Sequence, residues 1–205
     1  NNDDPCVVTG MARTPLGGFQ VGLREVSAPE LGSVARRAAL ERSGVQAEDI
    51  DEGRMGFVLP AGMGQAPARQ ASLGAGIPNA AGCTTVNKMC GSGMKATMMA
   101  HDTLRAETNE IMIAGGMESM TNAPHAINIS GGKKLSESNL IDTMIKDGLW
   151  DAFNGYHMGI TAENVAHKWN ISRKDQDEFA LLSQNKFEKA QKEGKFNNEI
   201  TPVFF

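Results

Sequence analysis

The stretch TTVNKMCGSGMKATMMAH (residues 84–101) joins an apolar run to a pattern typical of a helix, with Cys90 at the junction. Because the first turn of a helix carries unpaired N–H groups and partial positive charge, a cysteine placed there is favoured as the thiolate. Gly91 and Gly93 have no side chains, so a substrate can approach the sulfur and backbone N–H groups can point at it. This suits covalent catalysis, in which the thiolate attacks a carbonyl and backbone amides, that of Cys90 among them, bind the oxyanion. The residues alone also allow a small buried cysteine ahead of a glycine-rich helix start.

Predicted strands and helices alternate around this junction. Apolar runs that end at turn residues predict strands at 5–10, 53–60, 83–87 and 109–116. The segments between them predict helices at 28–43, 67–73 and 91–105, the last with an apolar side formed by Met94, Met98 and Leu104. A capping box of Ser27 and Glu30 opens the first helix, and Gly44 closes it. Such alternation predicts an α/β fold with a mostly parallel sheet.

The character of the chain changes after Gly116. Residues 117–170 are rich in Gly, Asn and Met and predict no clear strand, which is typical of a functional insertion. A short helix is expected at 161–169. Ser172 and Asp175 then cap a long amphipathic helix, whose apolar face is expected to hold Phe179, Leu182, Phe187 and Ala190. A final strand is expected at 198–205. We therefore divide the chain into an αβ domain at 1–116 and a second domain at 117–205.

Composition excludes several classes of protein. The net charge is −4, no basic run exceeds two residues, and one Tyr and two Trp form no stacking array, so nucleic-acid binding is not expected. Cys6, Cys83 and Cys90 are odd in number and lack CxxC spacing, which argues against a disulfide framework and a zinc site and favours a reducing compartment. Cys83 is interpreted as structural and Cys6 as buried. No membrane span or signal peptide is predicted.

Several motifs together resemble one family. The resemblance rests on VNKMCGSGMKA (86–96), IAGGMESMTNAPH (113–125), GYHMGITAENVA (155–166), ARTPLGGF (12–19) and LPAGMGQAPARQASLGAGIP (59–78). In order and spacing these are similar to motifs of the thiolases, the acetyl-CoA acetyltransferases, over nearly the whole chain. The resemblance implies a layered fold of two similar αβ halves with a loop domain inserted in the first. This chain then corresponds to the first half plus most of the loop domain, without the C-terminal half.

The resemblance also implies a reaction and its residues. Thiolases condense two acetyl-CoA into acetoacetyl-CoA and CoA and run the reverse thiolysis, with CoA as substrate or product and no further cofactor or metal. Cys90 is then the nucleophile, His157 lies beside the pantetheine arm and thioester, Met158 lines the acyl pocket, and Leu149 packs on pantetheine. From the residues alone, a structural histidine and two core residues are the alternatives. Glu118 is interpreted as structural, a carboxylate held by backbone donors.

Part of the family's machinery is missing from the sequence. The GHP histidine, the CxGGG cysteine and the NEAFA motif are not found, so these 205 residues alone are not expected to turn over. The alternatives are a β-ketoacyl synthase-like condensing enzyme and a non-catalytic half that binds CoA or partners. The family's habit implies a homodimer or homotetramer, with Lys133 and Lys134 at contacts between dimers. The bacterial cytoplasm is the expected location, and the mitochondrial matrix is the alternative.

Overall fold

The centre of the molecule is a three-stranded parallel sheet. The computed structural model describes residues 4–129 and 139–205. The strands are β1 (Glu52–Gly56), β2 (Gly82–Val86) and β3 (Met112–Gly116), in the order β2-β1-β3. Gly56 of β1 aligns with both Val86 and Gly116, so all three carboxyl ends meet at one edge of the sheet. The predicted α/β fold with a mostly parallel sheet is confirmed; β1 and β3 are shorter than expected, and β2 is shifted by one residue.

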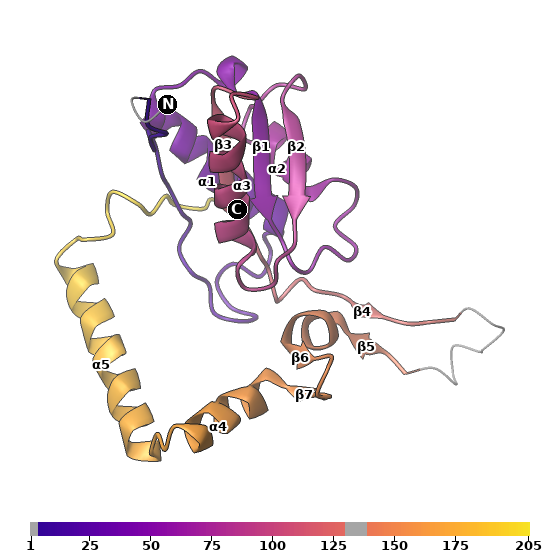
Figure 1. Ribbon diagram of the computed structural model, residues 1–205, viewed down its shortest axis with the longest axis vertical. Helices are drawn as coiled ribbons and strands as arrows, with labels where there is room; N and C mark the ends of the chain where they lie inside the picture. Colours follow the sequence, from indigo (N-terminus) through magenta and orange to yellow (C-terminus); the bar gives the residue numbers. More distant parts are fainter. Residues whose placement is uncertain (1–3, 130–138) are drawn as a thin grey trace.

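Three helices cover the two faces of this sheet. They are α1 (Ala28–Ser43), α2 (Pro67–Gly74) and α3 (Ser92–Arg105), and a short 3-10 turn, η1 (Ala47–Asp49), leads into β1. Met55 packs with residues of α1 and α2, whereas the neighbouring Gly56 faces the start of α3. Successive residues of a strand point to opposite faces, so α1 and α2 lie on one face and α3 on the other (Figure 1). We call the sheet with these helices the core.

The caps and buried residues of α1 explain its position. Ser27 and Glu30 form the predicted capping box, and Gly44 closes the helix in the left-handed region at φ 72°. The face toward α2 and the sheet is made mostly of small residues, which allows close packing. Arg36 is the exception, because it is a large, charged residue on this face, and only 3% of its surface is exposed. Its guanidinium donates to Ser72 Oγ and to the Ala68 carbonyl.

Two predicted strands do not form. Residues 5–10 are extended and mostly exposed, with Val7 and Val8 at 70% and 82% exposure, and Cys6 is exposed where burial was expected. Residues 198–205 also lack strand structure. A strand needs a neighbour to take up its N–H and C=O groups. In the described parts of the chain, segment 5–10 pairs with no strand, and segment 198–205 has a single bridge, from Ile200 to Arg13.

The predicted apolar side of α3 is wrong. Met94 and Met98 are 72% and 53% exposed. The face on the sheet instead presents Ala96 and Ala100, which are buried. These small side chains let the helix lie close to the strands, so the methionines point away from the core.

Residues after Gly116 form short elements outside the core. They are β4 (His125–Ala126), β5 (Ile141–Asp142), the π-helix η3 (Met144–Leu149), β6 (Trp150–Asp151), β7 (Tyr156–His157), α4 (Met158–Lys168) and α5 (Arg173–Lys192). The four two-residue strands were not predicted, since so short a segment has no periodicity to detect. Lys133 and Lys134 lie outside the described residues. The domain boundary at Gly116 stays a prediction.

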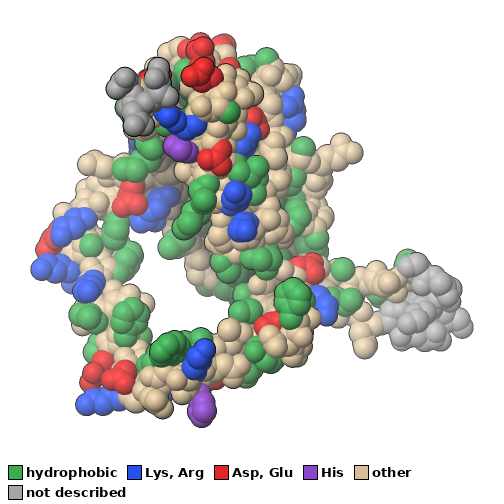
Figure 2. All heavy atoms as spheres, in the orientation of Figure 1, with side chains coloured by type: hydrophobic (Ala, Val, Ile, Leu, Met, Phe, Trp, Pro, Cys, Tyr) green, Lys and Arg blue, Asp and Glu red, His purple; other side chains and the backbone are tan. Residues whose placement is uncertain are grey.

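Helices α4 and α5 form an arm that stands away from the core. The predicted capping box of Ser172 and Asp175 is present at the start of α5. Figure 2 shows an opening between this arm and the core. Phe179, Leu182 and Phe187, the large side chains of the predicted apolar face, are all at least half exposed. The helix is therefore held by local caps and ion pairs, not by packing against the core.

The arm returns to the core through a short clamped segment (Figure 1). Arg42 Nη1 donates at 3.0 Å to the carbonyls of Asn198 and Glu199, and its Nη2 donates at 3.1 Å to that of Ile200. Arg13 exchanges two backbone hydrogen bonds with this segment, and its Nε lies 2.8 Å from Glu199 Oε2. Residues 198–201 are therefore fixed on the end of α1. In the described part of the chain, no helix is both long and apolar enough to cross a membrane.

Candidate active site

Cys90 lies in a tight turn between β2 and α3. Met89 adopts a left-handed conformation with φ 50°, which is uncommon for a residue other than glycine. The Met89 N–H donates to Asn87 Oδ1 at 3.0 Å. Ser92 Oγ accepts from the Lys88 N–H at 2.9 Å and donates to the Met89 carbonyl at 2.5 Å. The turn leaves Cys90 exposed at the predicted junction of strand and helix, and α3 begins at Ser92, one residue later than expected.

Three glycines let the start of α3 rest directly on the sheet. A Cβ on Gly56 would lie 2.3 Å from the carbonyl carbon of Ser92, and a Cβ on Gly116 would lie 3.2 Å from the Cα of Gly93. Distances below 3.0 Å are not tolerated by real Cβ atoms, so Gly56 is required by this contact. The carboxyl ends of β1 and β3 therefore set the depth of the Cys90 turn.

A groove of about 940 Å³ runs past this turn. It lies between the extended segment 6–14 and β3, and it is also lined by Met89, Cys90, Glu118, Gly148 and Leu149. Among the described residues, neither segment 6–11 nor the outer edge of β3 pairs with a strand, so both are available to line the groove. Two exposed thiols, Cys90 and Cys6, therefore line this largely apolar channel, and only Cys90 adjoins the start of a helix.

Glu118 ties together the ends of two strands beside the groove. Its carboxylate accepts the N–H groups of Val58 at 3.0 Å and Leu59 at 3.1 Å. Burial raises the pKa of Glu118, and the two backbone hydrogen bonds act in the opposite direction. The bonds to backbone donors agree with the structural interpretation of this residue.

The whole chain matches one family. Residues 6–205 match the family model described as thiolase, N-terminal domain. The chain belongs to the thiolase family.

Several relatives of this thiolase chain are named as acetyl-CoA acetyltransferases or thiolases. It is 54% identical over 198 residues to an acetyl-CoA acetyltransferase of Cupriavidus necator, covering 96% of this chain and 50% of that protein. It is 46% identical to a cytosolic acetyl-CoA acetyltransferase of Mus musculus, covering 98% and 50%. The Acat5 thiolase from Ascaris suum, solved in complex with coenzyme A, superposes with a TM-score of 0.91 at 37% identity, covering 95% of this chain and 51% of that one. The chain spans about half the length of the relatives it matches.

The thiolase chain brings some predicted site residues together and leaves others apart. Leu149, at the end of η3, is half-buried and lines the same groove as Cys90. His157 and Met158 do not line it; they are exposed at the junction of β7 and α4. His157 caps α4, because its Nδ1 accepts the Gly159 N–H at 3.0 Å. The binding roles of all three residues stay predictions.

One imidazole, that of His101, is found among the described residues that line the groove. His101 lines the groove, but nine residues of α3 separate it from Ser92, about 14 Å along a helix. Proton transfer needs a base within hydrogen-bond reach of the reacting atom or one water away. His101 is therefore not placed to activate the Cys90 thiol of this thiolase chain.

Sequence reasoning did not identify Ser92 or the contact of Gly56 with α3. A serine at the first position of α3 is visible in the sequence as a candidate turn-forming residue. The role of Gly56 depends on which helix lies on β1, and no local pattern reveals that.

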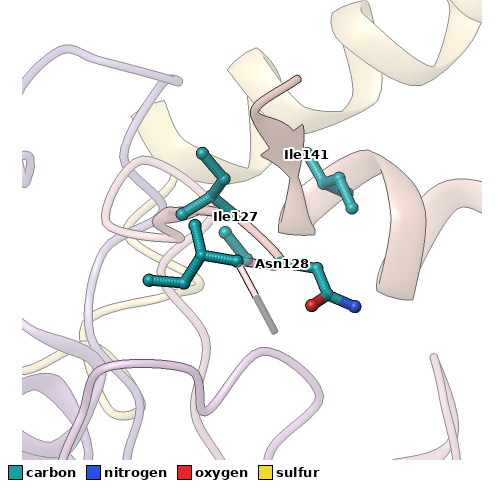
Figure 3. Close-up of a pocket in the computed structure, with 5 residues that line it drawn as sticks. Ile127, Asn128 and Ile141 are labelled. Carbon is teal, nitrogen blue, oxygen red and sulfur yellow. The ribbon is translucent and has the colours of Figure 1, made fainter. Parts of the chain in front are cut away.

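A smaller hollow lies where the chain leaves β4 and enters β5 (Figure 3). It measures about 530 Å³ and is lined by Ala126, Ile127, Asn128, Ile129 and Ile141. None of these side chains is a nucleophile, acid or base. This hollow is therefore not equipped for acyl transfer, and the Cys90 groove is the candidate active site.

Proposed function

We propose that Cys90 is the acyl-carrying nucleophile of an acetyl-CoA C-acetyltransferase, which condenses two acetyl-CoA into acetoacetyl-CoA and CoA reversibly. The single observation that carries the proposal is the exposed Cys90 at the start of α3, opening into a long apolar groove. The names of the relatives support the choice of substrate.

The geometry suits the first half of this reaction. The Cys90 thiol loses its proton to solvent, the sulfur attacks the thioester carbonyl of acetyl-CoA, and the carbonyl oxygen gains negative charge. Backbone N–H groups at the helix start, that of Cys90 among them, stabilise this charge. The C–S bond to CoA then breaks, which leaves acetyl-Cys90 and the CoA thiolate.

The second half of the reaction needs groups that the described residues do not bring to Cys90. The methyl carbon of a second acetyl-CoA must lose a proton to a base before it attacks acetyl-Cys90. We infer that this base belongs to a second half, present in the longer relatives, and that the 205-residue chain is acylated without turning over.

Three residues are proposed to bind the CoA thioester. Leu149 packs on the pantetheine arm, since it shares the groove with Cys90. The Nδ1 atom of His157 accepts a hydrogen bond, so a neutral imidazole carries its proton on Nε2. This Nε2–H can donate a hydrogen bond to the carbonyl oxygen of a thioester. Met158 follows directly and is proposed to restrict acyl length. Neither residue lines the groove in this structure, so these two roles require the loop domain to approach Cys90.

The assembly and location are also proposals. We propose a homodimer or homotetramer, and a cytoplasmic location with the mitochondrial matrix as the alternative. The name of the mouse relative, a cytosolic enzyme, supports the first location.

Intact mass spectrometry before and after incubation with acetyl-CoA tests the proposal. We expect the mass to rise by one acetyl group, and Cys90→Ala to abolish this gain. Cys83→Ala is the matched control and should be acetylated normally, because Cys83 packs against the core and donates to Ser72 Oγ at 3.3 Å. CoA binding without an adduct would favour the non-catalytic alternative. Loss of the acetyl group from Cys90 on addition of malonyl-CoA, with release of CO₂, would favour a β-ketoacyl synthase-like enzyme.

A further inference from the structure

The turn before α3 holds a conformation that its own residues do not favour. Met89 has φ 50°, and a left-handed conformation of a residue other than glycine persists only when neighbouring groups hold it. Ser92 Oγ binds the turn on both sides, accepting from the Lys88 N–H at 2.9 Å and donating to the Met89 carbonyl at 2.5 Å. Lys88 and Met89 are the two residues directly before Cys90. The hydroxyl of Ser92 therefore constrains the backbone that carries the reactive sulfur.

Ser92 itself is fixed. Only 4% of its surface is exposed. Its backbone lies so close to β1 that a Cβ added to Gly56 would come within 2.6 Å of the Ser92 carbonyl oxygen. Asn87 Oδ1 also accepts the Met89 N–H at 3.0 Å, but Asn87 is exposed. Ser92 is thus a buried residue whose backbone packs on the sheet and whose side chain hydrogen-bonds the turn, so it fixes the turn relative to the sheet.

We propose that Ser92 is a positioning residue for Cys90. It holds Met89 in the left-handed conformation and so keeps the Cys90 sulfur next to the N–H groups of the first turn of α3. Without the hydroxyl, the Lys88 N–H loses its partner, and the Met89 carbonyl keeps only the Ser92 backbone N–H at 3.0 Å. Met89 then relaxes and the sulfur moves away from the helix start. For acyl transfer the inference rests on the proposed function, whereas its geometric part does not.

The geometric part is tested by alkylating the 205-residue chain with iodoacetamide and following each cysteine by mass spectrometry. Ser92→Ala should slow the alkylation of Cys90 by about two- to five-fold, the effect of losing a helix-terminus interaction. The alkylation of Cys83 should not change, because it reports on the core. Thr103→Ala is the matched control. It removes another hydroxyl of α3, which donates to the Met99 carbonyl at 2.8 Å. This variant should alkylate like the wild type.

A second pair of variants separates the hydroxyl from the space it fills. Ser92→Thr and Ser92→Val add nearly the same volume, but only Thr keeps the Oγ. We expect Cys90 to react faster in the Thr variant than in the Val variant by the same two- to five-fold. In single-turnover acetylation, the maximal rate should be about tenfold lower with Val than with Thr, at an unchanged half-saturating concentration of acetyl-CoA.

The outcomes distinguish this inference from the proposed function. Equal Cys90 alkylation in Ser92→Ala and wild type, or in the Thr and Val variants, overturns the positioning role. A parallel rise of Cys83 alkylation in Ser92→Ala also overturns it, because Ser92 would then support the core as a whole. If the wild type is never acetylated but its alkylation follows the Ser92 hydroxyl, the proposed function fails and the positioning role stands.

Discussion

Replacing Gly56 by alanine should destabilise the chain more than any other single methyl group added to the sheet. The new Cβ would lie 2.3 Å from the Ser92 carbonyl carbon, 2.4 Å from the Gly93 nitrogen and 2.6 Å from the Ser92 oxygen. All three are backbone atoms, so no side-chain rotation relieves the clash, and α3 must move by about 1 Å to reach ordinary contact. Overpacking typically costs about 1–3 kcal/mol, and a clash with backbone belongs at the upper end. We expect the free energy of unfolding to fall by about 3 kcal/mol.

Urea denaturation followed by circular dichroism measures this loss. Gly115→Ala is the control, because its Cβ would meet only the Met55 sulfur, at 3.5 Å, in a flexible side chain. That variant should lie within about 1 kcal/mol of the wild type. If Gly56→Ala is as stable as Gly115→Ala, the start of α3 does not rest on β1 as described.

Three further predictions concern charge and capping. Arg36 is buried with its Nε and Nη2 unpartnered among the described residues, and burial lowers its pKa to about 10. Arg36→Met should therefore match or exceed the wild type in urea at pH 7, and a loss above about 2 kcal/mol would contradict this. The unfolded chain holds this proton more tightly, so the wild type should gain stability relative to Arg36→Met as the pH rises past 10. The hydrogen bond from Arg54 lowers the pKa of Glu52, so the ionised Glu52 stabilises the fold above pH 4.5, and this stabilisation is lost as the pH falls through the lowered pKa. In acid titrations, the difference in stability between the wild type and Glu52→Gln should vanish below that pKa. Ser27→Ala should cost about 1 kcal/mol in urea, whereas Ser172→Ala, on the unpacked α5, should reduce helicity at 222 nm without moving the unfolding midpoint.

The elements that the sequence predicts well are those decided by nearby residues. The caps at Ser27 and Ser172 are local hydrogen bonds, and both are present as expected. The strands of the sheet are apolar runs bounded by turn residues, and pairing partners exist for each. Segment 5–10 has the same pattern but no neighbouring strand in the described chain, and nothing local encodes whether a neighbour is present.

The candidate site divides in the same way. Cys90 was predicted from the glycines around it and the helix after it, which are adjacent in sequence. Glu118 bonds to residues about 60 positions earlier, and Gly56 contacts α3 across the sheet. Such contacts depend on topology, so periodicity alone cannot reveal them. The roles of His157 and Met158 come from resemblance, since neither residue lines the groove.

The clamp of Arg13 and Arg42 on residues 198–201 has a consequence for how this part of the chain can change. The chain leaves the core after Asn122, whose amide donates to the Val26 carbonyl at 3.0 Å, and is fastened to it again at the end of α1, so the segment between these points is a cassette with two anchored ends. The entropic cost of closing such a loop grows slowly, about 0.6 kcal/mol for each doubling of its length. Segments within the cassette can therefore be lengthened, shortened or exchanged at little cost to the sheet, provided that both anchors are kept.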